Sequence, residues 1–512
     1  MTKTESSPAV PESSSGSYGQ ILKSTSLIGG AAGINLLLGM VRMKFAAVLI
    51  GPAGVGLVGT YQAIQGMVGN VAGLGIQSSA VRDVAEAVGR NDNEAIGRTI
   101  LSLRRVCWVT GLFGMLAMVA LAVPLSRYTF QTADYALDIA LLGPIILFAN
   151  IQGGQSALLQ GMRRIGDLAR LQVIGAAAGT VLTVVLYAWL GLRGIVPSLL
   201  LLALVQLLAA WYFARRILVA PVKMSWLESF RAANGMLRLG LVFMWNSMIL
   251  ALVAYLTRAW ITQQFDLMAV GIFTAAFSLS GMFINFILGA MAADYYPRLT
   301  QVAHDHAAMR KLVNEQTEIG LLIAVPGLLA TLTLAPWIIR LFYTVDFLPA
   351  ASLLQWFILG CLGRVISWPL GFIMLALSKS KWFFFTETIF NSLHLVMIWW
   401  GLNILGVEGV AIAFFILYVV YMVAVYGLAR YLIGFSWAGG VLYLLAAFVP
   451  VVALAFASGR LLSPIPAAVL GVILTLAACL LCFRGLEQRI GEANKIIEIG
   501  LMVPGMRWIC QV

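Results

Sequence analysis

The chain has 512 residues, of which 61% are hydrophobic and only 11% are charged. Soluble domains carry about 25% charged residues, so this composition excludes a soluble protein and indicates an integral membrane protein. The formal net charge of +12 would favour a nucleic-acid partner in a soluble chain, but in a membrane protein it is typical of basic cytoplasmic loops, so we expect no nucleic-acid binding.

The predicted elements are almost all membrane-spanning helices. Residues 1–20 are rich in Ser, Pro and Gly, which predicts a disordered cytoplasmic tail. Apolar runs long enough to cross a ~30 Å hydrocarbon core then recur, and a bilayer forces such runs to be helices. The predicted fold is an all-α polytopic membrane protein with about 14 transmembrane helices. The expected spans lie near 27–50, 54–78, 106–126, 136–160, 171–190, 196–214, 239–262, 268–293, 319–342, 349–377, 383–404, 408–429, 437–458 and 463–483.

The turn between the first two spans resembles a nucleotide-binding loop. Gly54, Gly56 and Gly59 form G-x-G-x-x-G, which binds a dinucleotide when it joins a strand to a helix. Here the motif lies between two apolar spans, so we assign its glycines to a tight hairpin and close helix contact. G-x-x-x-x-G-K-[ST] does not occur. We therefore predict no nucleotide, no cofactor and no ATP hydrolysis.

The basic residues in the loops predict the orientation in the membrane. With the N-terminus inside, the loops on the cytoplasmic side hold pairs such as Arg104–Arg105 and Arg215–Arg216. The outer loops hold single arginines, such as Arg127 and Arg193. This asymmetry follows the positive-inside rule and predicts that both termini are cytoplasmic.

An internal repeat with an offset of 215 residues divides the spans into two sets of six. The stretch RGIVPSLLLLALVQLLAAWYFAR (193–215) resembles EGVAIAFFILYVVYMVAVYGLAR (408–430), and Val55-Gly56-Leu57 matches Val270-Gly271-Ile272. Because six spans separate the copies, both have the same orientation, and an axis along the membrane normal relates them. Transporters of this kind bind substrate between the halves and expose it alternately to each side. The predicted organisation is a tail (1–20), two six-helix bundles (21–218 and 236–432), an additional helix pair (437–484) and a cytoplasmic, amphipathic tail (485–512).

Four basic residues lie within predicted spans, namely Arg42, Lys44, Arg258 and Arg364. A charge at bilayer depth costs at least ~2.5 kcal/mol and usually faces a functional cavity. Arg42 and Arg258 occur at similar depth in the first helix of each half, which favours a cationic cavity for a phosphorylated head group. Alternatively, Arg42 and Lys44 reach the outer interface or pair with acids such as Asp138 and Asp266.

Other polar groups within the spans are weaker candidates. Glu387 and His394 are seven residues apart on one helix face, which fits either a proton path or a hydrogen-bonded structural pair. Five amides could line the cleft as sugar-facing groups or join helices: Asn70, Gln152, Gln155, Asn246 and Asn285. His304-Asp305-His306 resembles a metal cluster, but its histidines point apart on a helix, so we expect no metal site.

Three stretches resemble a known family. FAAVLIGPAGVGLVGTYQAI (45–64), GLGIQSSAVRDVAE (73–86) and VGIFTAAFSLSGMFINFILGAMAADYYPRLTQV (270–302) are similar to the Wzx-type flippases of O-antigen and enterobacterial common antigen. These flippases belong to the superfamily of multidrug, oligosaccharidyl-lipid and polysaccharide exporters (the MOP superfamily). The resemblance covers about residues 20–432.

The resemblance implies a flippase of the bacterial inner membrane rather than an enzyme. It would move undecaprenyl-pyrophosphate-linked oligosaccharide from the cytoplasmic to the periplasmic leaflet, driven by an ion gradient, with the pyrophosphate on the cavity arginines. The implied partners are this glycan, membrane lipids, and the polysaccharide polymerase and chain-length regulator proteins. Twelve spans are usual in the family, whereas we expect fourteen here. The last two are a spectator pair, a lipid groove as in lipid II flippases, or an overcount of the spans.

Three alternatives remain at the level of the sequence. A lipid II-type flippase has the same fold. A multidrug exporter of the superfamily would place acids rather than bases in the cleft, because it handles organic cations. A membrane-bound glycosyltransferase or polymerase would need a catalytic group in a sizeable outer loop, and no predicted outer loop exceeds about a dozen residues.

Overall fold

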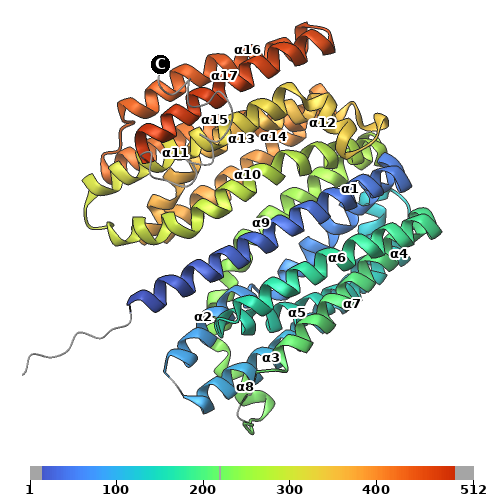
Figure 1. Cartoon of the computed structure of the whole chain (residues 1–512). Coiled ribbons are helices and arrows are strands. Elements are labelled where there is room, and N and C mark those ends of the chain that lie inside the picture. Colours follow the sequence, from blue (N-terminus) through green and yellow to red (C-terminus); the bar gives the residue numbers. More distant parts are fainter. Residues whose placement is uncertain (1–13, 91, 218, 220, 491–512) are drawn as a thin grey trace, which may run out of the picture. The chain divides into compact units, whose positions relative to one another are not determined.

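The computed structural model describes residues 14–90, 92–217, 219 and 221–490, and every long element in these ranges is a helix (Figure 1). This confirms the predicted all-α fold. The helices up to residue 264 are α1 (Ser14–Gly73), α2 (Ile76–Gly89), α3 (Asn93–Phe130), α4 (Ala136–Leu141), α5 (Gly143–Gly161), α6 (Ile165–Leu190), η1 (Gly191–Gly194), α7 (Ile195–Ala214), α8 (Trp226–Ala232) and α9 (Asn234–Gln264). Those that follow are α10 (Leu267–Gln301), α11 (His306–Thr333), α12 (Ala335–Phe342), η2 (Val345–Phe347), α13 (Ala350–Ala376), α14 (Ser380–Leu405), α15 (Val407–Ile433), α16 (Gly439–Leu461) and α17 (Pro464–Ile490).

Membrane-spanning length and composition recur throughout the described residues. Twelve helical stretches are long and apolar enough to cross a bilayer. Two of them, Gly29–Gly73 and Ile165–Ala214, are 45 and 50 residues long, whereas about 20 residues suffice for one crossing. Each contains a break, at Gly51 and at Gly191–Gly194. The chain is thus a multi-pass membrane protein, and the exact number of crossings stays a prediction.

The break inside α1 depends on Gly51. Its backbone has φ 62° and ψ −172°, which is not helical, and Pro52 follows directly. A positive φ favours glycine, since glycine has no Cβ to clash with the backbone. The chain therefore leaves the helical conformation at Gly51, just before the G-x-G-x-x-G motif at which we expected a hairpin. Helix α1 begins at Ser14, inside the tail that we expected to be disordered. Residues 1–13 of that tail lie outside the described residues.

By internal packing the chain forms two compact units. Unit 1 comprises Met1–Phe45, Val68–Ala122 and Leu137–Trp245, and unit 2 comprises Ala46–Met67, Val123–Ala136 and Asn246–Val512. Because each unit collects separate stretches of the chain, the units interleave along the sequence. The two consecutive bundles expected from the repeat, and the axis between them, stay predictions.

Unit 1 has an apolar core at the end where α2, α3, α5 and α7 meet. Ile76, Leu103, Leu159 and Phe213 are buried there. On another side of the unit α6 and α7 run antiparallel, because a Cβ on Gly175 would meet Gln206 and one on Gly179 would meet Leu202. Small residues permit this close approach of membrane helices.

Unit 2 has a second core, in which α10, α11, α13 and α15 meet around Tyr295, Val313, Leu370 and Val425. Glycines bring helices of this unit together as well. A Cβ on Gly56 would collide with the Leu267 carbonyl of α10, and one on Gly271 would collide with the Pro52 carbonyl of α1. The close helix contact assigned to Gly56 is therefore confirmed, and Gly271 is the residue that the predicted repeat matches to it.

Candidate functional site

Arg42 in unit 1 is directed at helix α6. The side chain is half-buried, and its Nη1 lies 2.9 Å from the position that a Cβ on Gly179 would occupy. The guanidinium therefore packs against α6 at Gly179, where the helix has no side chain. Lys44, on the same helix, is also half-buried.

Arg258 in unit 2 lies within a crowded helix contact. Its Nη1 donates to the Ala254 carbonyl at 2.9 Å, and its guanidinium lies 5.3 Å from the centre of the Phe273 ring. The Nε is buried and has no hydrogen-bond partner in the described part of the chain. The same is true of the Thr274 hydroxyl, and a Cβ on Gly59 would lie within 3.3 Å of both groups. Two unpartnered polar groups thus flank the last glycine of the motif.

Arg364 in unit 2 lines a cavity of about 310 Å³ between α13, α14 and α15. Glu387, Asn391 and Tyr421 line the same cavity. The Tyr421 hydroxyl donates to Glu387 Oε1 at 3.3 Å. Arg364 therefore shares its surroundings with an acid, whereas Arg258 forms no ion pair within the described part of the chain.

His394 does not form a hydrogen-bonded pair with Glu387. Its ring lies 6.1 Å from that of Phe414, between centres, and its Nε2 is buried without a partner among the described residues. Glu387 instead contacts Tyr421 of α15. The seven-residue spacing places both on α14, but the structure brings only Glu387 to the Arg364 cavity.

The five amide candidates have different surroundings. Gln152 donates to the Ser156 hydroxyl at 2.9 Å, and Asn285 is exposed, with its Nδ2 next to Gly281. Asn246 Oδ1 is buried without a partner in the described ranges. Asn70 is half-buried in unit 1, and Gln155 lines a separate cavity there. The structure does not gather these amides at one place within either unit.

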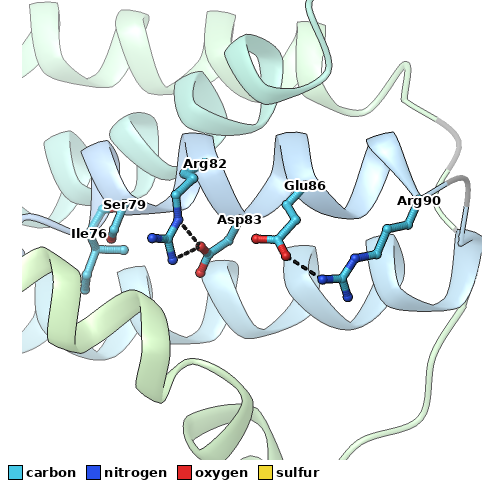
Figure 2. Close-up of polar contacts among 6 residues, drawn as sticks. All are labelled: Ile76, Ser79, Arg82, Asp83, Glu86 and Arg90. Carbon is cyan, nitrogen blue, oxygen red and sulfur yellow. Dashed lines mark hydrogen bonds and ion pairs between the residues drawn. The ribbon is translucent and has the colours of Figure 1, made fainter. Parts of the chain in front are cut away.

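The second family stretch, 73–86, forms the start of an amphipathic helix. Gly75, with φ 62°, precedes α2, whose buried face includes Ile76 and Val84. The opposite face is charged: Figure 2 shows Arg82 beside Asp83 and Arg90 beside Glu86. The predicted span 54–78 is thus too long at this end, because α1 ends at Gly73 and the amphipathic helix α2 begins at Ile76.

The His304-Asp305-His306 sequence has a structural explanation. Asp305 caps α11, because its carboxylate accepts hydrogen bonds from the backbone N–H groups of Ala307 and Ala308 at 2.8 and 3.1 Å. Asp and Asn are favoured at this position since they satisfy N–H groups that the helix leaves unpaired.

Sequence reasoning missed two residues that contact the candidate site residues, Thr274 beside Arg258 and Tyr421 beside Glu387. Thr274 and Tyr421 are uncharged and lie inside apolar helices, so no sequence signal distinguished them from packing residues. Asn391 lies one turn after Glu387 on α14, and this spacing is a signal that could have found it.

Comparison with known proteins identifies a family and two relatives of the chain. The chain matches the family described as polysaccharide biosynthesis protein over residues 21–303. It is 25% identical over 405 residues to the Lipid III flippases of Escherichia coli (strain K12) and Shigella flexneri, covering 76% of this chain and 92% of each relative.

Two solved structures share the fold. One is a multidrug resistance MATE family transporter of the MOP superfamily in an inward-facing conformation, with a TM-score of 0.67, 17% identity, and coverage of 78% of this chain and 94% of that one. The other is the lipid II flippase MurJ in an inward closed conformation, with a TM-score of 0.66, 14% identity, and coverage of 91% and 99%.

The fold defines a multi-pass membrane protein with the architecture of a MATE family transporter of the MOP superfamily and of a lipid II flippase. The match over residues 21–303 adds the family: the chain belongs to the polysaccharide biosynthesis protein family. The expected resemblance to Wzx-type flippases is thereby confirmed, as is a multi-pass protein of the inner membrane.

Proposed function

We propose that the protein is a flippase that moves an undecaprenyl-pyrophosphate-linked oligosaccharide, an O-antigen or related surface polysaccharide unit, across the inner membrane. Transport runs from the cytoplasmic to the periplasmic leaflet by alternating access, and both termini are cytoplasmic. The family and the two curated flippases, which cover most of the chain, support the class of substrate. The polysaccharide polymerase and chain-length regulator remain the proposed protein partners.

The observation that carries the proposal is the state of Arg258. An arginine inside a membrane helix is expensive and usually serves a function. Here Nε is buried without a partner, next to the unpartnered Thr274 hydroxyl. A buried donor without a partner costs about 1–3 kcal/mol, which a phosphate oxygen would offset through a charge-assisted hydrogen bond.

We assign each group of candidate residues to the part of the substrate that its chemistry fits. Arg42 and Arg258 would bind the pyrophosphate, with Lys44 and Arg364 as further basic groups. The amides listed above would face the sugars, and the polyprenyl tail would stay in lipid. No nucleotide site is proposed, so the energy would come from an ion gradient, with Glu387 and His394 as candidate coupling groups.

The direct test uses purified protein in liposomes with a fluorescent polyprenyl-pyrophosphate glycan. We expect Arg258→Ala and Arg42→Ala to abolish movement between leaflets, and Lys at either position to restore it partly, because lysine keeps the charge but loses the planar fork of donors. Arg238→Ala is the matched control, since Arg238 is an exposed arginine on the same helix as Arg258. Normal flipping by the double alanine variant would refute the pyrophosphate role.

The same vesicles separate the alternatives. A multidrug exporter would move organic cations and ignore the glycan lipid. A lipid II-type flippase would move a peptidoglycan precursor in preference to an O-antigen unit. We expect neither activity to match transport of the O-antigen-type substrate.

A further inference from the structure

Unit 1 contains a second cavity, and none of the four basic residues proposed to bind the pyrophosphate lines it. Its volume is about 680 Å³, and it lies between α3, α5, α7 and the segment after α7. Pockets for small molecules are typically about 300–1,000 Å³. Two arginines line it, Arg104 from α3 and Arg215 from the end of α7, and no carboxylate is among the lining residues. The cavity is therefore positively charged.

Two polar groups in this cavity lack partners. Arg104 Nε is buried and has none among the described residues, and the same holds for Gln155 Oε1. Gln155 is only 6% exposed. Oxygen and nitrogen of a glutamine amide are assigned from their partners, so a rotated Gln155 presents N–H donors at the same place. Both groups would gain a partner from a bound anion.

Arg105 shows what a structural arginine looks like at the same level of α3. Its Nη1 donates to the Met224 and Ser225 carbonyls at 2.9 and 2.8 Å and to the Ser229 hydroxyl at 2.7 Å. The Nε of Arg104, its neighbour, has no acceptor among the described residues. Arg215 is held over Trp211, 4.9 Å from the ring centre, which orients the guanidinium but leaves its N–H groups available.

The walls of the cavity indicate that the anion belongs to a lipid. Trp108, Leu208 and Trp211 line it and are about half exposed, and they lie in stretches long and apolar enough to span the membrane. Exposed apolar side chains on such helices face acyl chains, and tryptophan is enriched at the level of the head groups. An anion that binds here therefore has a hydrocarbon chain beside it.

We propose that this cavity binds the net-anionic, phosphate-bearing head group of a membrane lipid through Arg104 and Arg215. Basic pockets between membrane helices are typical sites for such head groups. The leaflet is the cytoplasmic one, which rests on the proposed orientation, because Arg90 and Arg163 lie in turns at the same end of unit 1. The lipid is either an anionic phospholipid or the phosphorylated polyprenyl carrier, and both present the same chemistry.

The test is lipid binding by the purified full-length chain, measured by native mass spectrometry. The probes are phosphatidylglycerol, polyprenyl phosphate and, as the head group without net charge, phosphatidylethanolamine. We expect the first two to be retained and Arg104→Ala/Arg215→Ala to bind them about 30-fold more weakly, since each basic residue contributes about a factor of five. Arg216→Ala is the control, because Arg216 is the neighbouring exposed arginine and does not line the cavity.

Two further measurements keep the outcome decisive. Arg215→Glu reverses a charge on an exposed residue, so it tests the site without removing a buried side chain. On the unmodified chain, a photoreactive phosphatidylglycerol should label peptides from α3 and α7. Stronger retention of phosphatidylglycerol identifies a phospholipid site, and stronger retention of polyprenyl phosphate identifies a carrier site.

The proposal is overturned by equal binding of phosphatidylethanolamine, or by full retention in both Arg215 variants. It fails separately from the proposed function, because Arg42→Ala/Arg258→Ala should lose flipping and keep this lipid.

Discussion

Arg258 and Arg364 have the same side chain in the same unit but opposite surroundings. Arg258 lies against Phe273 with an unpartnered Nε, whereas Arg364 shares a cavity with Glu387 and Tyr421. A positive charge without a recorded acid attracts an anionic substrate. A basic and an acidic side chain in one cavity instead have a combined charge that changes when a proton or another cation binds. Such a pair is suited to coupling transport to an ion gradient.

At the residue scale we predict that Glu387→Gln uncouples transport from the ion gradient. Glutamine keeps an oxygen that accepts the Tyr421 hydrogen bond, recorded at 3.3 Å, but it cannot ionise. An imposed gradient of protons or of sodium should therefore no longer accelerate flipping in liposomes, while binding of the glycan lipid persists. Glu315→Gln, an exposed acid on α11, serves as the control. A variant that still responds fully to the gradient would remove Glu387 from the coupling role.

Single residues also show the limits of the sequence. Arg104 and Arg105 are adjacent, and both counted simply as cytoplasmic loop charges in the topology prediction. In the structure Arg105 donates to three oxygens, whereas Arg104 lines a cavity and its Nε has no acceptor among the residues that the structure describes. No local pattern separates them, because the difference depends on α7 and on residues 224–229, more than 100 positions away in the chain.

Among the elements, α8 is a short helix that is fixed by a reciprocal cap. Glu228 accepts a hydrogen bond from the Ser225 backbone N–H at 2.7 Å, and the Ser225 hydroxyl accepts one from the Glu228 N–H. Arg105 lies over Trp226, 4.9 Å from the ring centre. These contacts tie the segment between α7 and α9 to α3.

We predict that α8 loosens in acid. The Ser225 backbone N–H, and then its hydroxyl, hold the pKa of Glu228 below its ordinary value. The contribution to helix stability is therefore complete above the unfolded pKa of about 4.3 and is lost as the pH falls through the lower folded pKa. The protection factors of residues 226–232, which are hydrogen-exchange rates corrected for the intrinsic pH dependence of exchange, should fall more steeply from about pH 5 to about pH 3 in the natural chain than in Glu228→Gln, which keeps the acceptor without titrating. Identical profiles would show that the cap does not hold α8.

The elements themselves were largely predictable, since apolar periodicity in lipid leaves only the helix as a solution. Their ends and breaks were less so. The motif glycines drew attention to 54–59, yet the break falls at Gly51, where only the backbone angle reveals the need for glycine. The part of 485–512 beyond Ile490, where we expected an amphipathic tail, lies outside the described residues.

For the molecule as a whole, the additional pair α16 and α17 is an integral part of unit 2. Arg489 of α17 contacts Glu318 of α11 at 2.5 Å, and Arg460 of α16 contacts Glu408 of α15 at 2.5 Å. Helix α16 also approaches α11 closely, because a Cβ on Gly440 would collide with the Glu318 carboxylate. The sequence predicted the pair but not its attachment, since the partners lie more than 50 residues apart. These contacts tie the pair to unit 2, so we expect it to move with that unit during transport.

We predict that this attachment contributes measurably to stability. The Arg489 and Glu318 side chains are 29% and 14% exposed, so breaking the pair should cost about 1–2 kcal/mol, between the values for exposed and for buried ion pairs. Glu318→Ala, Arg489→Ala and the double variant should lower the thermal stability in nanodiscs by similar amounts, because all three remove one interaction. Gly440→Leu should act in the same way without changing either charge, since the new side chain displaces the carboxylate. Lys311→Ala, which removes an exposed ion pair from the same helix, should change stability by less than about 0.5 kcal/mol. Strictly additive losses in the double variant would show that Arg489 and Glu318 stabilise the protein independently, and that this ion pair does not hold the additional pair of helices in place.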